Sequence, residues 1–201
     1  MSLTDAQVDA LREMINIGIG RAAGVLNAML RSHVSLQVPV VEIISMSELE
    51  QKAQEFGKHV FSAVRLGFKG PLSGNASLVF PAESAAKLVI LLTEDETGSP
   101  DLDSIRIGTL TEVGNIILNG VMGVIGNEIQ QHIYYSVPTY MENPIEALFT
   151  VHAPGSAGAT LVWVQTRFVV EHHRIDGEII LMFEMGSLDL LLGAINREMG
   201  L

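Results

Sequence analysis

Apolar side chains return every three or four positions along several stretches of the chain, which is the spacing of a helix with one buried face. The first stretch covers residues 4–31, where Thr4 and Gln7 form the pattern of a capping box. The pattern predicts a second long helix at residues 102–131. It also predicts three shorter helices, at residues 45–56, 82–93 and 187–199.

Segments rich in β-branched and aromatic residues lie between the predicted helices. Residues 34–44 form one predicted strand, and residues 132–140 form another, followed by an irregular stretch at 141–159. Two hairpins are also predicted. The first pairs residues 60–68 with 75–80, and the second pairs 160–170 with 178–183 around a polar turn at 172–177.

The second half of the chain repeats the first. A glutamate, an asparagine and a proline recur at an offset of 99 positions, and a hairpin glycine and phenylalanine recur at an offset of 103. An acidic segment at 94–103 is the predicted linker. We expect a single domain over residues 1–201 with repeat halves 1–98 and 99–201. The expected fold class is α+β, an internally duplicated pseudo-two-fold domain with a central, largely antiparallel sheet flanked by long helices.

Composition removes several classes of function. The chain has 48% hydrophobic residues, enough for a sizeable core, and a formal net charge of −11, which argues against a nucleic-acid surface. It has no cysteine, so disulfides and thiolate metal sites are excluded. The start of the chain lacks the basic and apolar segments of a secretory signal, and no uninterrupted apolar run approaches about 18 residues. We therefore expect a cytoplasmic protein without membrane insertion.

The candidate chemistry lies on the two long predicted helices. Asp9, Glu13 and Asn16 are four and three positions apart, so they share one helical face. Taken once, a Glu and an Asn at this spacing usually belong to a solvated face. Two observations favour a functional role instead. The pair recurs in both halves, and each Asn lies in apolar sequence, where an unpaired amide is costly to bury. The second helix repeats the register with Gly108, Glu112 and Asn115.

The pattern Asp/Ser-x3-Glu-x2-Asn-x22-Pro resembles the signature of the CheC/CheX/FliY phosphatase family of chemotaxis proteins. In the first half it is matched by Asp9, Glu13, Asn16 and Pro39. In the second half it is matched by Glu112, Asn115 and Pro138, whereas Gly108 departs from the expected Asp or Ser. CheX resembles the chain less because it has one motif per chain, and FliY resembles it less because it has extra flagellar-switch segments.

The resemblance implies an enzyme, an aspartyl-phosphate phosphatase that acts on a phosphorylated CheY-like response regulator. Asn16 and Asn115 would orient the attacking water, and Glu13 and Glu112 would pair with the regulator's lysine. Asp9 would help to bind the partner. The chain would need no cofactor of its own, since the Mg²⁺ belongs to the regulator. A CheD-like deamidase is a second partner that the resemblance suggests.

Two other functions remain open. The chain resembles a domain that could act as a non-catalytic adaptor for a response regulator or a CheD-like deamidase. It could also be a flagellar-switch component. His172 and His173 lie in the predicted polar turn, and a shared metal there is not expected, because adjacent side chains of an extended segment point apart. No metal site is therefore predicted.

Overall fold

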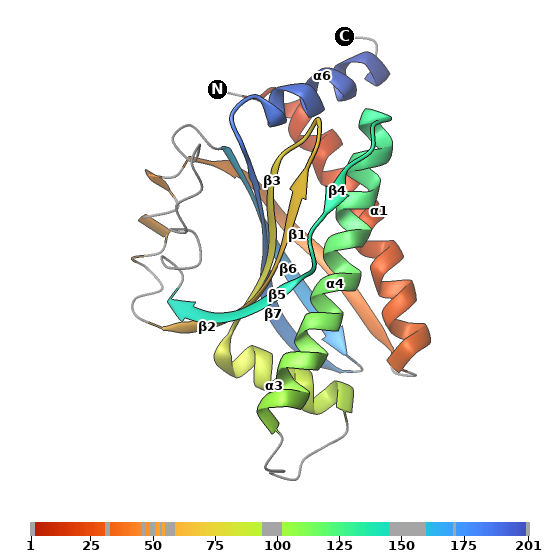
Figure 1. Cartoon of the computed structure of the whole chain (residues 1–201). Helices are drawn as coiled ribbons and strands as arrows, with labels where there is room; N and C mark the ends of the chain where they lie inside the picture. Colours follow the sequence, from red (N-terminus) through yellow and green to blue (C-terminus); the bar gives the residue numbers. More distant parts are fainter. Residues whose placement is uncertain are drawn as a thin grey trace.

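The computed structural model describes residues 3–30, 33–45, 47–48, 51–52, 54, 59–93, 102–144, 160–170 and 172–199 (Figure 1). The helices are α1 (Asp5–Leu30), α3 (Ala82–Thr93), α4 (Leu102–Ile129) and α6 (Ser187–Met199). The strands are β1 (Val34–Ile44), β2 (Val60–Lys69), β3 (Gly74–Pro81), β4 (Tyr134–Tyr135), β5 (Thr139–Pro144), β6 (Thr160–Val170) and β7 (His173–Phe183).

All the described strands join one sheet, and every pairing between them is antiparallel. The order is β1-β6-β7-β3-β2, after which β4 and β5 both pair with β2. The fold is therefore α+β with an antiparallel sheet, as predicted. When β1 is exchanged with β5, β2 with β6 and β3 with β7, the strand order read from the opposite edge of the sheet is unchanged. This arrangement is compatible with the expected duplication, which stays a prediction.

The helices cover one face of this sheet. Figure 1 shows α1 and α4 side by side along that face, with α3 and α6 near its opposite ends. The main core lies between helices and sheet, where the buried faces of α1 and α4 meet Val64, Phe80 and Phe168. A smaller apolar cluster around Trp163 and Phe61 lies on the other face of the sheet. The outer faces of α1 and α4 are thus left open to solvent.

Glycine allows α1 and α4 to touch backbone to backbone. A Cβ atom at Gly18 would lie 2.6 Å from the Cα of Val121 and 2.8 Å from the carbonyl oxygen of Gly120. A Cβ at Gly120 would in turn lie 2.7 Å from the carbonyl oxygen of Gly18. Gly114 has the same role against the sheet, where a Cβ would lie 2.6 Å from the Cβ of Val64. These contacts fix which face of each long helix points outward.

Most predicted elements are confirmed, with three corrections. The predicted turn at 172–177 is wrong, because β7 begins at His173 and pairs with β6 along its whole length. The predicted strand at 132–140 is split into β4 and β5, with Pro138 between them. The prediction of an irregular stretch from 141 is wrong as far as residue 144, which ends β5. Residues 94–101 of the predicted linker, half of the predicted helix at 45–56, and residues 145–159 lie outside the described residues.

Within the described part of the chain one helical stretch, Asp103–Ile129 of α4, has the length and composition of a membrane span, with a mean hydropathy of 1.2 in its most apolar window. In this fold 44% of that window is buried within the protein. Its buried residues pack against α1 and the sheet, and polar residues such as Glu112 and Asn119 lie on its exposed face. The buried part of α4 thus belongs to the core of this fold.

Candidate functional site

The first motif copy lies on the outer face of α1. Asp9, Glu13 and Asn16 are all exposed, while Leu11, Ile15 and their apolar neighbours point into the core. The spacing of the buried residues sets this orientation, because a helix that buries one stripe presents the opposite stripe to solvent. Neither Glu13 nor Asn16 has a hydrogen-bond partner among the described residues. Both side chains are available to a binding partner.

Asp9 is engaged locally. Its Oδ1 accepts a hydrogen bond from Nη1 of Arg12 at 2.8 Å, in an i,i+3 ion pair near the start of α1. The carboxylate is 70% exposed, so this pair contributes little stability, and it places one acidic and one basic group beside the motif. The second copy has Gly108 and Thr111 at the two corresponding positions. No such ion pair can form there.

The second copy lies on α4 and is more enclosed. Glu112 is exposed, as Glu13 is, whereas Asn115 is half-buried. The Oδ1 of Asn115 accepts a hydrogen bond from Nδ2 of Asn119 at 2.6 Å. The sequence led us to expect that burial of each Asn would require a compensating interaction. This holds only for Asn115, because Asn16 is exposed and burial costs it nothing. Neither amide faces the interior.

Corresponding residues attach the two motif helices to other elements. Gln7 caps α1 in reciprocal hydrogen bonds with Thr4, which confirms the capping box, and its Nε2 donates to Oδ1 of Asn196 in α6. Its counterpart 99 positions later is Arg106, which forms an ion pair with Glu142 of β5 and donates to Tyr140 at 3.3 Å. These contacts hold each motif helix near its N-terminal end.

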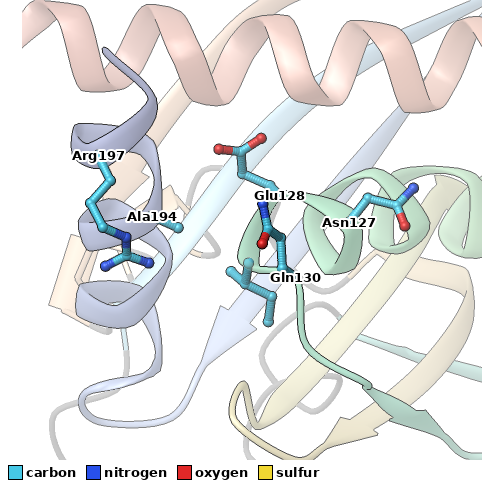
Figure 2. A pocket seen from close by; sticks show the side chains of 6 residues that line it. Asn127, Glu128, Gln130, Ala194 and Arg197 are labelled. Atoms are coloured by element: carbon cyan, nitrogen blue, oxygen red, sulfur yellow. The ribbon is translucent and has the colours of Figure 1, made fainter. Parts of the chain in front are cut away.

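The motif residues line none of the three described cavities. The first, of about 400 Å³, lies between the C-terminal end of α4 and α6, and Figure 2 shows Arg197 of α6, Glu128 of α4 and Gln130, which follows α4, around it. The other two, of about 570 and 490 Å³, lie against β2 and β1 respectively. The candidate site is therefore an open surface, a form that suits a folded partner better than a small molecule.

Metal ligation is not a feature of the described part of the chain, where no three His, Asp or Glu residues cluster in a way that could hold an ion. His172 and His173 are exposed at the start of β7. Glu178 carries a strongly perturbed carboxyl group, but it belongs to the opposite face of the sheet. Burial raises its pKa to about 7, while a hydrogen bond from Trp163 and the charge of Lys52 lower it.

Asn119 contacts a motif residue but is not part of the predicted motif. The signal was present, because Asn119 follows Asn115 by one helical turn, a spacing at which side chains meet. Its counterpart at the offset of 99 is Gly20, so this position separates the two copies. The motif was defined by residues that both copies share, so it does not include a position at which the copies differ.

No model of a known protein family matches the chain. Over 145 residues it is 26% identical to the CheY-P phosphatase CheC of Bacillus subtilis, a match that covers 68% of this chain and 66% of the relative, slightly less than two thirds of its length.

Several solved structures share the fold, among them FliY and CheX. FliY of Thermotoga maritima aligns with a TM-score of 0.75 at 18% identity, covering 98% of this chain and 99% of that one. The CheX-CheY-BeF3-Mg²⁺ complex of Borrelia burgdorferi aligns with a TM-score of 0.54 at 18% identity, covering 85% and 97%. The CheC relative and these structures are thus similar to this chain, in sequence and in fold respectively, and they agree with the resemblance to the CheC/CheX/FliY family that the duplicated motif carries.

Proposed function

We propose that this protein is a phosphatase that hydrolyses the aspartyl phosphate of a CheY-like response regulator in chemotaxis signalling. The observation that carries the proposal is the outward exposure of Glu13 and Asn16 on an open helical face, with Glu112 and Asn115 in the same register on α4. Projecting side chains can reach an acyl phosphate on a folded partner. Further support comes from the relative named a CheY-P phosphatase and from the CheX neighbour bound to CheY.

The proposed reaction is an in-line displacement. The oxygen of a water molecule forms a bond to phosphorus while the bond from phosphorus to the aspartyl oxygen breaks. The electron pair of that bond leaves with the carboxylate, and the products are inorganic phosphate, a proton and the free aspartate. Little covalent chemistry is asked of the phosphatase, so its contribution is to position the water and steady the developing charge.

An asparagine amide is suited to positioning that water. Its carbonyl oxygen accepts a hydrogen bond from the water, and its NH₂ group donates one to the water or to a phosphoryl oxygen. In this proposal Asn16 and Asn115 each hold one water molecule, at two sites on the same open face. An amide is not a general base, and the reaction requires none from this chain.

The carboxylates set the register of the complex in this proposal. Glu13 and Glu112 pair with the regulator's lysine, and Asp9 adds a contact beside the first copy. The Mg²⁺ is supplied by the regulator as part of the substrate. A chain with a net charge of −11 also favours a basic patch on the partner. The location follows that of the regulator, so we propose the cytoplasm.

The second candidate function is binding without hydrolysis, as an adaptor for a response regulator or a CheD-like deamidase, or as a flagellar-switch component. It is favoured by the likeness to FliY, whose TM-score of 0.75 exceeds the 0.54 of the CheX complex. The intact Glu and Asn in both copies favour the phosphatase, because a protein that only binds has no need of two water-positioning amides.

The two functions are separated by measuring hydrolysis and binding on the same sample. A CheY-type receiver domain is charged with acetyl phosphate in Mg²⁺, and phosphate release is followed with and without the protein. The phosphatase proposal predicts faster release at substoichiometric protein, which shows turnover. Binding of the charged receiver without faster release would contradict the proposal and establish the adaptor.

A further inference from the structure

The two motif copies differ one helical turn after their asparagine. Asn119 follows Asn115 on α4, and at the corresponding place on α1 Gly20 follows Asn16. The single amide of Asn119 makes two hydrogen bonds to the same residue. Its Nδ2 donates to the Oδ1 of Asn115 at 2.6 Å and to the backbone carbonyl oxygen of Asn115 at 2.8 Å.

The chemistry of these contacts settles which way each amide points. A backbone carbonyl oxygen only accepts hydrogen bonds, so the group of Asn119 that meets it must be the NH₂ group. That NH₂ group then needs an acceptor from the Asn115 side chain, which therefore presents its oxygen. The NH₂ group of Asn115 is left on the other side of its amide, away from Asn119.

The first copy has no equivalent restraint. Asn16 is exposed and has no hydrogen-bond partner among the described residues. Gly20 offers no side chain, and a Cβ atom built there would meet nothing within 4 Å, so the space one turn after Asn16 is open. The Asn16 amide is thus free to rotate among its rotamers, whereas the Asn115 amide is held in one orientation.

We propose that Asn119 is a positioning residue that holds the Asn115 amide in its working orientation before the substrate arrives. The inference rests on the proposed phosphatase function and adds a difference between its two sites. Asn119 uses one lone pair of the Asn115 oxygen, which leaves the second lone pair and both N–H groups for water and phosphate. An amide that is already oriented loses less entropy when it binds the attacking water, so the held copy turns over faster.

The test isolates each copy and then moves the restraint between them. In an Asn16→Ala background, where only the second copy works, Asn119→Ala is expected to lower the turnover rate about 3- to 10-fold, a loss of the order that follows from misplacing a catalytic group. The half-saturating concentration of acetyl-phosphate-charged receiver should stay the same. In an Asn115→Ala background, Gly20→Asn should raise the turnover of the first copy.

A spectroscopic arm separates this inference from the proposed function. In the full chain without receiver, Asn119→Ala should shift and broaden the Asn115 side-chain NH₂ resonances and leave those of Asn16 unchanged. An Asn115 signal that moves while turnover stays the same would overturn the positioning role and leave the phosphatase proposal intact. An unchanged Asn115 signal would also overturn it. A chain that releases no phosphate in either background would overturn both.

Discussion

The two motif helices present the same residues in different surroundings. On α1, Glu13 and Asn16 are exposed beside the Asp9–Arg12 ion pair, and the turn that follows is open. On α4 the acidic position is a glycine, and the following turn supplies Asn119, which holds the motif amide. Shared spacing therefore does not make two sites equivalent, because each neighbour acts on a different property. In the proposals made above, Asp9 beside the first copy affects binding of the receiver, and the hydrogen bond in the second copy affects the orientation of its amide.

The largest expected effect comes from removing both amides. The Asn16→Ala, Asn115→Ala double variant should lose its acceleration of phosphate release by at least about 100-fold, because neither copy can then position a water molecule. Both side chains lie outside the core, so the thermal midpoint should stay within a few degrees of the parent. Acceleration close to the parent's in a folded double variant would refute the catalytic assignment.

The next effect concerns the crossing that the two helices share. Gly18→Ala places a methyl group 2.6 Å from the Cα of Val121, where only backbone could move aside, and should destabilise the fold by about 2–4 kcal/mol. Gly24→Ala on the same helix is the matched control, because its methyl group meets nothing within 4 Å. It should stabilise the fold by about 0.5–1 kcal/mol through helix propensity. Urea unfolding measures both, and equal stabilities would refute the close crossing.

The next effect is on the pH dependence of stability, in which the two halves should differ because of a buried carboxyl group on the sheet face away from the helices. Glu178 in β7 corresponds to the neutral Asn75 in β3 at the offset of 103. Burial raises the pKa of Glu178 from 4.5 to about 7, so the folded state holds a proton that the unfolded state has lost between those values. Unfolding free energy should therefore fall as pH rises from about 4.5 to 7 and then level off.

Glu178→Gln is expected to remove this part of the pH dependence and to stabilise the protein at pH 8 by about 1–3 kcal/mol. At pH 4 the carboxyl group is protonated in both states, so the variant and the parent should have similar stabilities there. Thermal melts across this range give the answer. Parallel curves for the two proteins would contradict the raised pKa.

The smallest effect concerns the charge that only the first copy has. Asn16→Ala should raise the half-saturating concentration of charged receiver more than Asn115→Ala does, because the copy that then remains has Gly108 in place of an acidic residue. Gly108→Asp in the Asn16→Ala background should lower the half-saturating receiver concentration about 2- to 5-fold, as expected for one exposed charge. Its Cβ meets nothing within 4 Å, so the substitution fits. Equal half-saturating concentrations for the two single variants would remove the role given to this position.

Local signals predicted most of the fold, and long-range contacts account for the errors. The capping box at Thr4 and Gln7 and the period of apolar residues placed α1 within one residue at each end. The start of β7 was missed because His173 and the polar residues after it are typical of a turn. Pairing with β6 as far as Val170 makes them a strand, and no local pattern carries that information.

In the candidate site, too, local spacing predicts some features and long-range packing determines others. Motif spacing placed Glu13 and Asn16 on one helical face, and their exposure agrees with it. The depth at which the Asn115 amide lies depends on how α4 packs, through Gly114 and Gly120, against β2 and α1. The buried state of Glu178 depends on neighbours from other strands in the same way. Such features arise from residues far apart in the chain, so spacing alone does not predict them.

The proposed function requires the two motif amides to meet the phosphoryl group of a receiver domain. The most direct measurement follows the side-chain NH₂ resonances of Asn16 and Asn115 while a CheY-type receiver is added, once with beryllium trifluoride and Mg²⁺ and once without. We predict that both pairs of resonances shift with the beryllium trifluoride form and stay in place with the bare receiver. Shifts confined to other surfaces, with both amides unmoved by the beryllium trifluoride form, would contradict the account.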